Sequence, residues 1–170
     1  MRVSRIYIDS ELQTGQPQTL DPRASHYVSQ VLRLRTGQPL TLFNGDGNDW
    51  TATITSPGRR RCEVQVGSIV ASEPPPCVTI RLGLGISRGD RMDLAIQKAV
   101  ELGVSAITPL RTDRSNVQLD DTKAVKRHAH WQGVVISACE QSGRSRLPSL
   151  GAISDLDAWL GEQRNGVLLY

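Results

Sequence analysis

The chain has 170 residues, of which 38% are hydrophobic and 22% are charged. This composition is typical of globular proteins and excludes disordered and fibrous chains, and the length suffices for one domain or two small ones. No stretch reaches the roughly 18 consecutive apolar residues of a membrane span, and residues 1–9 lack the apolar core of a signal peptide, so we expect a soluble, cytoplasmic protein.

The basic residues are mostly arginines. Lysine and arginine number 20 against 17 acidic residues, which gives a net charge of +3, and the only lysines are Lys98, Lys123 and Lys126. Because the planar guanidinium matches phosphates and base edges, this balance favours a nucleic-acid ligand. A GC-rich genome would produce the same excess of arginine. The aromatic content of 4% is too low for a protein that holds single strands mainly by stacking.

Cysteine and histidine spacing argues against a metal site. Cys62, Cys77 and Cys139 match neither a CxxC pair nor a disulfide framework, so we expect reduced thiols. His128 and His130 are two positions apart on a predicted helix, which turns them roughly 200° from each other. We therefore expect no metal.

The first part of the chain predicts a small, mostly antiparallel β-barrel around one helix. Residues 5–8 predict a strand, and Asp21-Pro22 is typical of a helix start, with the helix running through Leu32. The turn at 44–47 (NGDG) lies between two alternating strands, a hairpin signal. A further alternating strand begins at Cys62.

Residues 72–76 (SEPPP) predict an extended spacer and a domain boundary, which gives one domain over 1–72 and another over 77–170. The second domain alternates strands and helices, which indicates a Rossmann-like parallel sheet. We predict strands at 78–86 and 104–110 and helices capped by Asp90 and by Ser154. A long helix is predicted over residues 121–142, ending at Gly143.

The last residues predict that more chain belongs to this domain. After Asn165-Gly166 a fresh apolar strand starts at Val167 and reaches Tyr170. A parallel sheet that ends in a new four-residue strand is typical of an interrupted domain, so we expect a truncated or partly ordered chain.

Gly83, Gly85 and Gly89 lie where a dinucleotide-binding loop would be, between a strand and a helix. Their spacing differs by one residue from that of the fingerprint. We interpret the first two as strand positions that something approaches closely, and Gly89 as a turn residue. An oxidoreductase with a nicotinamide cofactor is therefore the weakest of the alternatives.

Basic side chains gather at the ends of the predicted elements. In an open parallel sheet the carboxyl ends of the strands line the ligand crevice, and Arg88, Arg111 and Arg114 are predicted there. Each could equally be a solvated surface residue. We expect Lys98 and Glu101 to form a paired or solvated helix face.

Several motifs, taken together and in order, resemble the ribosomal RNA small subunit methyltransferase E family. They are VLRL at 31–34, GDG at 45–47, SRGDRMD at 87–93, IQKAVELGV at 96–104, ITPL at 107–110, DRS at 113–115, Trp131 and ACEQSGR at 138–144. The resemblance covers nearly the whole chain.

The resemblance implies an N-terminal PUA-like barrel that holds RNA and a SPOUT-class α/β domain whose C-terminal trefoil knot binds S-adenosylmethionine. It further implies methylation of N3 of a uridine in small-subunit ribosomal RNA, or in the small ribosomal subunit, by a homodimer. The glycine-rich knot segments that hold the cofactor in the family are absent up to Tyr170. The cofactor-binding residues are thus expected beyond Tyr170, and we expect this chain alone to be inactive.

Matching motifs carry the family's site residues onto this chain. The methyl-transfer site would include Arg114, Glu140, Gln141 and Arg144, and RNA would be bound by His26, Arg33, Arg35, Arg88 and Arg91. Glu140 could accept the N3 proton, while Arg114 or Arg144 could stabilise charge on the uracil oxygens. The main alternative is a non-catalytic protein that binds ribosomal RNA.

Overall fold

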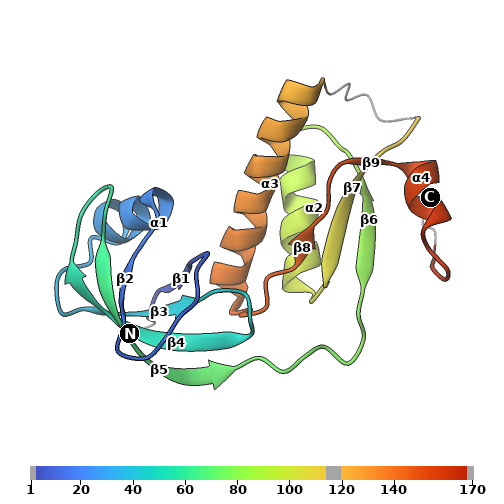
Figure 1. Cartoon of the computed structure of the whole chain (residues 1–170). Coiled ribbons are helices and arrows are strands. Elements are labelled where there is room, and N and C mark those ends of the chain that lie inside the picture. Colours follow the sequence, from blue (N-terminus) through green and yellow to red (C-terminus); the bar gives the residue numbers. More distant parts are fainter. Residues whose placement is uncertain (1–2, 114–119, 168–170) are drawn as a thin grey trace. The chain divides into compact units, whose positions relative to one another are not determined.

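The computed structural model of the chain describes residues 3–113 and 120–167, which form two compact units (Figure 1). The first unit combines the residues up to 75 with residues 139–147, and the second combines residues 76–138 with the residues from 148 onward. The last turn of the long helix and the loop after it therefore pack with the N-terminal part of the chain. Among the described residues, no helix has the length and apolarity to cross a membrane.

The first unit is a five-stranded sheet that curls into a half-barrel (Figure 1). Its strands, in spatial order, are β1 (Arg5–Tyr7), β3 (Pro39–Phe43), β4 (Asn48–Ser56), β5 (Glu63–Ser72) and β2 (Pro17–Thr19). All neighbouring strands are antiparallel except β1 and β3, which are parallel. The predicted hairpin at residues 44–47 joins β3 to β4, so the mostly antiparallel β unit is confirmed.

The helix predicted from Asp21-Pro22 is also confirmed. Asp21 is the N-cap of α1 (Pro22–His26), and its carboxylate accepts a hydrogen bond from the backbone N–H of Ala24 at 2.8 Å. The chain then widens into a π-helical turn, η1 (Tyr27–Val31), where the N–H of Leu32 donates to the carbonyl of Tyr27 at 2.9 Å.

The core of the first unit lies between the curled sheet and this helix. Alternate residues of β3, β4 and β5 face it, which explains the alternating pattern of the sequence. Its buried side chains are Ile6, Ile8, Leu12, Leu20, Ala24, Val28, Leu40, Leu42, Ala52, Ile54, Cys62, Val64 and Val66.

The second unit is a parallel α/β sheet, as predicted. β7 (Ala106–Arg111) pairs in parallel with β6 (Arg81–Gly85), β8 (Ser149–Leu150) and β9 (Ser154–Asp155). The helices are α2 (Asp90–Glu101), α3 (Asp121–Ser142) and α4 (Leu156–Gly161). In α2 the buried residues Met92, Ile96 and Val100 recur every four positions, which gives the apolar face that the sequence predicts.

Three local predictions for the second unit were wrong. The strand predicted over 78–86 is shorter because its register partner in β7 begins at Ala106, opposite Arg81, which leaves Val78 exposed. Asp90 is the first residue of α2, and Gly89 is the N-cap. Ser154 belongs to β9, and Asp155 occupies the N-cap of α4. Of the strand predicted over 167–170, Val167 is described and is exposed outside any strand, and residues 168–170 lie outside the described residues.

The predicted strand and turn positions of the glycines in the second unit are confirmed, but the predicted close approach holds for Gly83 and not for Gly85, where the nearest atom to a Cβ would be 3.8 Å away. Gly83 and Gly85 lie in β6, and a Cβ atom on Gly83 would come within 2.7 Å of both the Leu110 side chain and the Trp159 ring. Gly89 is a turn residue with a φ of 55°. α3 ends before Gly143, whose φ of 86° is in the left-handed region that favours glycine.

Candidate functional site

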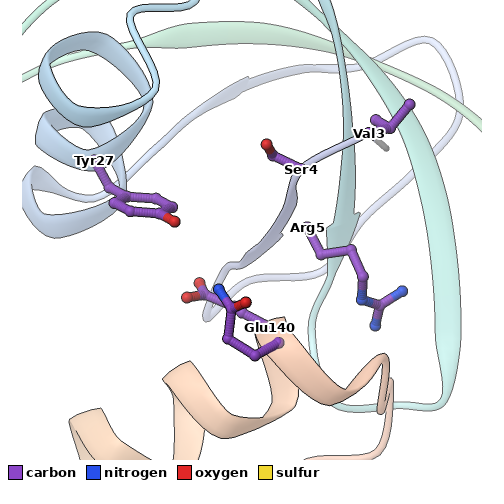
Figure 2. Close-up of a pocket in the computed structure, with 6 residues that line it drawn as sticks. Val3, Ser4, Arg5, Tyr27 and Glu140 are labelled. Carbon is purple, nitrogen blue, oxygen red and sulfur yellow. The ribbon is translucent and has the colours of Figure 1, made fainter. Parts of the chain in front are cut away.

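A polar cavity of about 190 Å³ opens in the first unit (Figure 2). It is lined by Val3, Ser4, Arg5, Tyr27, Glu140 and Gln141. In Figure 2, Tyr27 and Glu140 project toward one another from opposite sides of the cavity, and the guanidinium of Arg5 is directed away from it. Two of the predicted methyl-transfer residues, Glu140 and Gln141, therefore line one cavity with residues from β1 and η1.

Glu140 is buried, with 8% of its surface exposed, and its carboxylate is held by two neighbours. Oε1 accepts hydrogen bonds from the backbone N–H of Tyr7 at 3.1 Å and from Nη2 of Arg23 at 3.0 Å. Oε2 accepts a weaker one from Nη1 of Arg23 at 3.4 Å. A buried carboxylate needs such donors, because an unpaired charge there would be strongly destabilising.

Tyr27 reaches the cavity from an irregular stretch of backbone. The π-helical turn begins at this residue, and π turns are frequent at functional sites. Six residues later Arg33 has a φ of 54°, the only positive φ of a non-glycine residue in the described part of the chain. Such strained conformations cluster at ligand sites. The stretch from Tyr27 to Arg33 therefore has the local irregularity expected of a binding surface.

Arg144 lies beside the same helix end but is largely buried, with 13% of its side chain exposed. Its Nε is 3.5 Å from Oε1 of Glu73, at the start of the proline-rich spacer. The second oxygen of Glu73 accepts hydrogen bonds from the backbone N–H groups of Ser145 at 2.5 Å and Arg146 at 2.8 Å. One carboxylate thus fixes the loop that follows α3.

Ser145 of this loop forms a buried polar cluster with Arg5 and Asp49. Arg5 forms an ion pair with Asp49, and both side chains are about nine-tenths buried. Ser145 donates to Oδ1 of Asp49 at 2.5 Å, and Nη2 of Arg5 donates to the carbonyl of Arg144 at 3.0 Å. The guanidinium carbon of Arg5 also lies 4.8 Å from the centre of the Phe43 ring, within cation–π range.

Sequence reasoning missed these supporting residues. Alternation gives no signal for them, because the buried residues Ile6 in β1 and Ala52 in β4 place Arg5 and Asp49 on the other face of their strands. The two paired residues are also 44 positions apart, so their ion pair cannot be read from the sequence.

The predicted RNA-binding residues of the first unit are all exposed. His26 is at the end of α1, and Arg33 and Arg35 follow η1. The turn between β4 and β5 adds three more exposed arginines, Arg59, Arg60 and Arg61. These residues give the unit a positively charged surface.

In the second unit the carboxyl ends of the strands lie at one edge of the parallel sheet. Arg88 follows β6 and Arg91 is in the first turn of α2, and both are exposed. Arg111 ends β7, with its Nη1 3.7 Å from Oδ1 of Asp155. A cavity of about 530 Å³ at this edge is lined by Arg111, Thr112, Asp113, Asp155, Leu156, Asp157 and Ala158. Arg114 lies outside the described residues.

The two histidines of α3 have separate partners. His128 Nε2 lies 3.1 Å from the carbonyl of Gly151, and His130 Nε2 lies 2.7 Å from Oδ2 of Asp93. Over residues 3–113 and 120–167, no group of three or more His, Cys, Asp or Glu side chains could hold a metal ion. On α2, Lys98 and Glu101 form the predicted exposed pair at 2.6 Å.

The cysteine thiols are expected to react very differently. Burial raises the pKa of Cys139 from 9.0 to about 12, and burial also raises the pKa of Cys62, whereas Cys77 is exposed. Since the thiolate is the nucleophile, a thiol reagent at pH 8 should modify Cys77 first and the other two only after unfolding. Mass spectrometry of partially labelled protein tests this, with Cys77→Ser as the control. Equal labelling of Cys139 and Cys77 in the folded chain would contradict it.

The same pKa shift has a consequence for stability. The folded state keeps the Cys139 proton above pH 9, where the unfolded state loses it. The protonated Cys139 thiol therefore contributes fully to the free energy of unfolding below about pH 9, and this contribution is lost as the pH rises toward 12.

Two family models match the chain. The model of an RNA methyltransferase domain matches residues 73–170, and the model of an RNA methyltransferase PUA domain matches residues 20–67. The first of these alone covers more than half of the chain.

Relatives of established name are similar along most of the chain. Ribosomal RNA small subunit methyltransferase E of Buchnera aphidicola subsp. Schizaphis graminum is 34% identical over 149 residues, which are 88% of this chain and 61% of that protein. The protein of the same name from Buchnera aphidicola subsp. Acyrthosiphon pisum is 29% identical over 96% of this chain and 65% of its own length. The chain thus spans less than two thirds of the length of these two relatives.

Two solved structures share the fold. A methyltransferase from Legionella pneumophila in complex with the cofactor SAM superposes with a TM-score of 0.93 at 39% identity, covering 96% of this chain and 68% of that one. A ribosomal RNA small subunit methyltransferase E from Neisseria gonorrhoeae bound to S-adenosyl methionine gives 0.90 at 38% identity, covering 96% and 67%.

Proposed function

Because the chain belongs to the ribosomal RNA small subunit methyltransferase E family, we propose that it serves S-adenosylmethionine-dependent methylation of N3 of a uridine in small-subunit ribosomal RNA. The observation that carries this proposal is the joint match of both family models in one chain, together with the high structural similarity to a relative solved with the cofactor. We propose a homodimer that acts in the cytoplasm on the RNA or on the small ribosomal subunit.

The exposed arginines support an RNA substrate. On the first unit, His26, Arg33 and Arg35 form the proposed RNA-binding surface, and Arg88 and Arg91 form that of the second unit. Guanidinium groups on exposed loops and helix ends are typical phosphate contacts, which position RNA without reading its sequence. We assign this holding role mainly to residues 1–72 and the methyl transfer to the domain over 77–170.

The charge and volume of the cavity at the carboxyl ends of the second unit's strands support binding of the cofactor there. The cavity there, at about 530 Å³, is within the range of roughly 300–1,000 Å³ that suits small ligands. The carboxylates of Asp113 and Asp157 would pair with the ammonium group of S-adenosylmethionine, whereas Arg111 is already paired with Asp155. The other cofactor-binding residues are the ones expected beyond Tyr170. When bound, the cofactor supplies an electrophilic methyl group on its sulfonium.

The residues around the end of α3 support the proposed loss of the proton from N3 of the uracil. N3 of uridine is a weak nucleophile until its proton leaves, so the site needs an acceptor for that proton. Glu140 is the proposed acceptor, through Oε2, whose contact with Arg23 is the longer of the two. Gln141, Arg144 and Arg114 are proposed to hold the uracil and to stabilise the negative charge on its oxygens.

A chimera tests the proposed reaction. The chain replaces the matching part of the Neisseria gonorrhoeae relative, and the chimera is incubated with radiolabelled S-adenosylmethionine and unmodified small ribosomal subunits. We expect label in 3-methyluridine. A folded chimera that binds the cofactor and the subunit but labels another nucleoside, or none, would refute the proposal, and RNA binding without label would favour a non-catalytic RNA-binding protein.

In the same chimera, Glu140→Gln is expected to lower the single-turnover rate by about 10²- to 10⁴-fold, because general base catalysis contributes that much. The amide keeps the size of the side chain and can still accept from the Tyr7 N–H. The rate is measured with saturating cofactor and subunit. A wild-type rate in a folded variant would show that Glu140 is not the base.

Loss of one exposed arginine should weaken RNA binding equally for all sequences. Arg35→Gln removes a proposed phosphate contact, so the slope of log K against log salt should become shallower by about 0.7–0.9. Fluorescence anisotropy with labelled RNA over a salt series measures this slope. Arg164→Gln is the matched control, since it removes the same charge from an exposed position with no proposed role. Equal slopes for the two variants would contradict the assignment of Arg35.

A further inference from the structure

We infer that Glu73 is a positioning residue for the proposed methyl transfer, and that it acts by fixing the guanidinium of Arg144 beside the end of α3. This inference rests on the proposed function, which assigns Arg144 to the methyl-transfer site. It gives a role to the spacer that follows β5, where the sequence indicates only a domain boundary. The residues that carry the inference all belong to the first unit.

Glu73 differs from the rest of the spacer. Between positions 71 and 80 it is the one residue that is not exposed. Its backbone is held on both sides, because its N–H donates to the carbonyl of Gly47 at 2.7 Å and its carbonyl accepts from Nε of Arg146 at 3.0 Å. Three prolines follow it and restrict the backbone further. The Glu73 carboxylate is therefore held in place by contacts that involve no substrate.

The turn between β3 and β4 makes room for one of these contacts. A Cβ atom on Gly47 would lie 2.8 Å from Cζ of Arg146, so a larger residue would displace this guanidinium. The Arg146 side chain can thus pass over the turn and reach the carbonyls of Glu73 and Pro74, at 3.0 and 3.2 Å. The turn, the spacer and the loop after α3 are joined at this point.

The two oxygens of the Glu73 carboxylate have different partners. Oε2 accepts hydrogen bonds from the backbone N–H groups of Ser145 at 2.5 Å and Arg146 at 2.8 Å. These two bonds are sufficient to fix the backbone of the loop. Oε1 adds a contact to a single side chain, Nε of Arg144 at 3.5 Å. A residue that only anchored the loop would not need this contact, which therefore indicates a role at the guanidinium.

The contact between Glu73 and Arg144 lies close to the proposed base. Burial raises the pKa of the Cys139 thiol from 9.0 to about 12, and four nearby charges also affect this pKa. They belong to Arg144, Glu73, Arg5 and Glu140. All four charges are thus near one buried point at the end of α3. A guanidinium fixed there in advance can stabilise negative charge that develops on a substrate oxygen.

Two substitutions separate this role from that of a loop anchor. In Glu73→Gln the amide oxygen can still accept from the N–H groups of the loop, but the amide nitrogen is a donor and cannot pair with Arg144. Glu73→Asp keeps the charge and withdraws the carboxylate by one methylene group. Glu11→Gln is the matched control, because it removes the same charge from an exposed position of the same unit. Circular dichroism and urea denaturation measure the folded fraction of each variant.

In the chimera, Glu73→Gln should lower the single-turnover rate at saturating cofactor and subunit by roughly 10- to 100-fold, because a displacement of about 1 Å in a reacting site has an effect of this size. Glu73→Asp should give an intermediate rate, and Glu11→Gln the unsubstituted rate. The cofactor and subunit concentrations at half-maximal rate should change by less than about twofold, since Glu73 is assigned no contact with either. In an Arg144→Gln background, Glu73→Gln should have almost no further effect.

The unsubstituted rate in either folded Glu73 variant would overturn the inference and leave the proposed function intact. A loss of rate no greater than the loss of folded protein would also overturn it, since Glu73 would then be a loop anchor only. Independent effects of Glu73→Gln and Arg144→Gln would show that Glu73 does not act through Arg144. If Glu73→Gln does not fold, the rate of Glu73→Asp decides. A folded, unsubstituted chimera that binds cofactor and subunit without methylating N3 of uridine would overturn the proposed function itself.

Discussion

Asp49→Ala is expected to lower the free energy of unfolding by about 3–5 kcal/mol, as is typical when one partner of a buried ion pair is removed. The substitution leaves the Arg5 guanidinium buried, with only 11% of its side chain exposed and its charge unpaired. It also takes the acceptor from the Ser145 hydroxyl. The result would be a destabilised junction between the first strand and the loop that follows α3.

Urea denaturation followed by circular dichroism measures this loss. Glu63→Ala is the matched control, because it breaks the Arg61–Glu63 pair on the surface, where the side chains are 73% and 42% exposed. Exposed pairs contribute roughly 0–1 kcal/mol, so the control should change little. Equal effects of the two substitutions would show that the buried cluster is not a stabilising element.

Gly83→Ala is expected to cost about 1–3 kcal/mol, because overpacking a dense core forces its neighbours to move. The new Cβ would lie 2.7 Å from Leu110 Cδ1 and 2.7 Å from the Trp159 ring. Leucine can turn aside at its flexible end, but the indole is rigid, and its Cζ3 and Cη2 atoms would lie only 2.7 and 2.8 Å from the new Cβ. We therefore expect a weakened contact between α4 and the sheet.

Gly85→Ala is the control for Gly83→Ala, since both residues lie in β6 and differ only in their surroundings. The nearest atom to a Cβ on Gly85 is Thr112 Cγ2 at 3.8 Å, an ordinary contact. The midpoint temperature of thermal unfolding should be lower for Gly83→Ala than for the unsubstituted chain. For Gly85→Ala it should be almost unchanged. A reversed order would contradict the close-packing interpretation of Gly83.

The local elements could be predicted from sequence because their signals lie within a few residues. Asp21-Pro22 predicts the start of α1, the NGDG turn predicts the β3–β4 hairpin, and Gly143 predicts the end of α3, and all three are confirmed. The errors arise where pairing with a neighbouring strand determines the first residue of an element. β6 begins at Arg81, opposite Ala106 of β7, although the apolar pattern starts at Val78.

The candidate site was only half predictable for the same reason. Glu140 and Gln141 stand out in the sequence through their motif, but the partner of Glu140 is Arg23, 117 residues away. Tyr27 has no sequence signal of its own, because a π-helical turn and an ordinary helix have similar patterns. What the sequence lacks is the long-range packing that brings the end of α3 to the first sheet.

The interleaving of the two units along the chain constrains how the protein folds during synthesis. Asp49 and Glu73 leave the ribosome well before their partner Ser145, and Glu140 also belongs to the first unit. At roughly 5–20 residues per second, several seconds pass before those partners arrive. The N-terminal unit must therefore remain incomplete until most of the second unit has been made. Until then Arg5 and Asp49 lack Ser145, and their charges stay exposed to water.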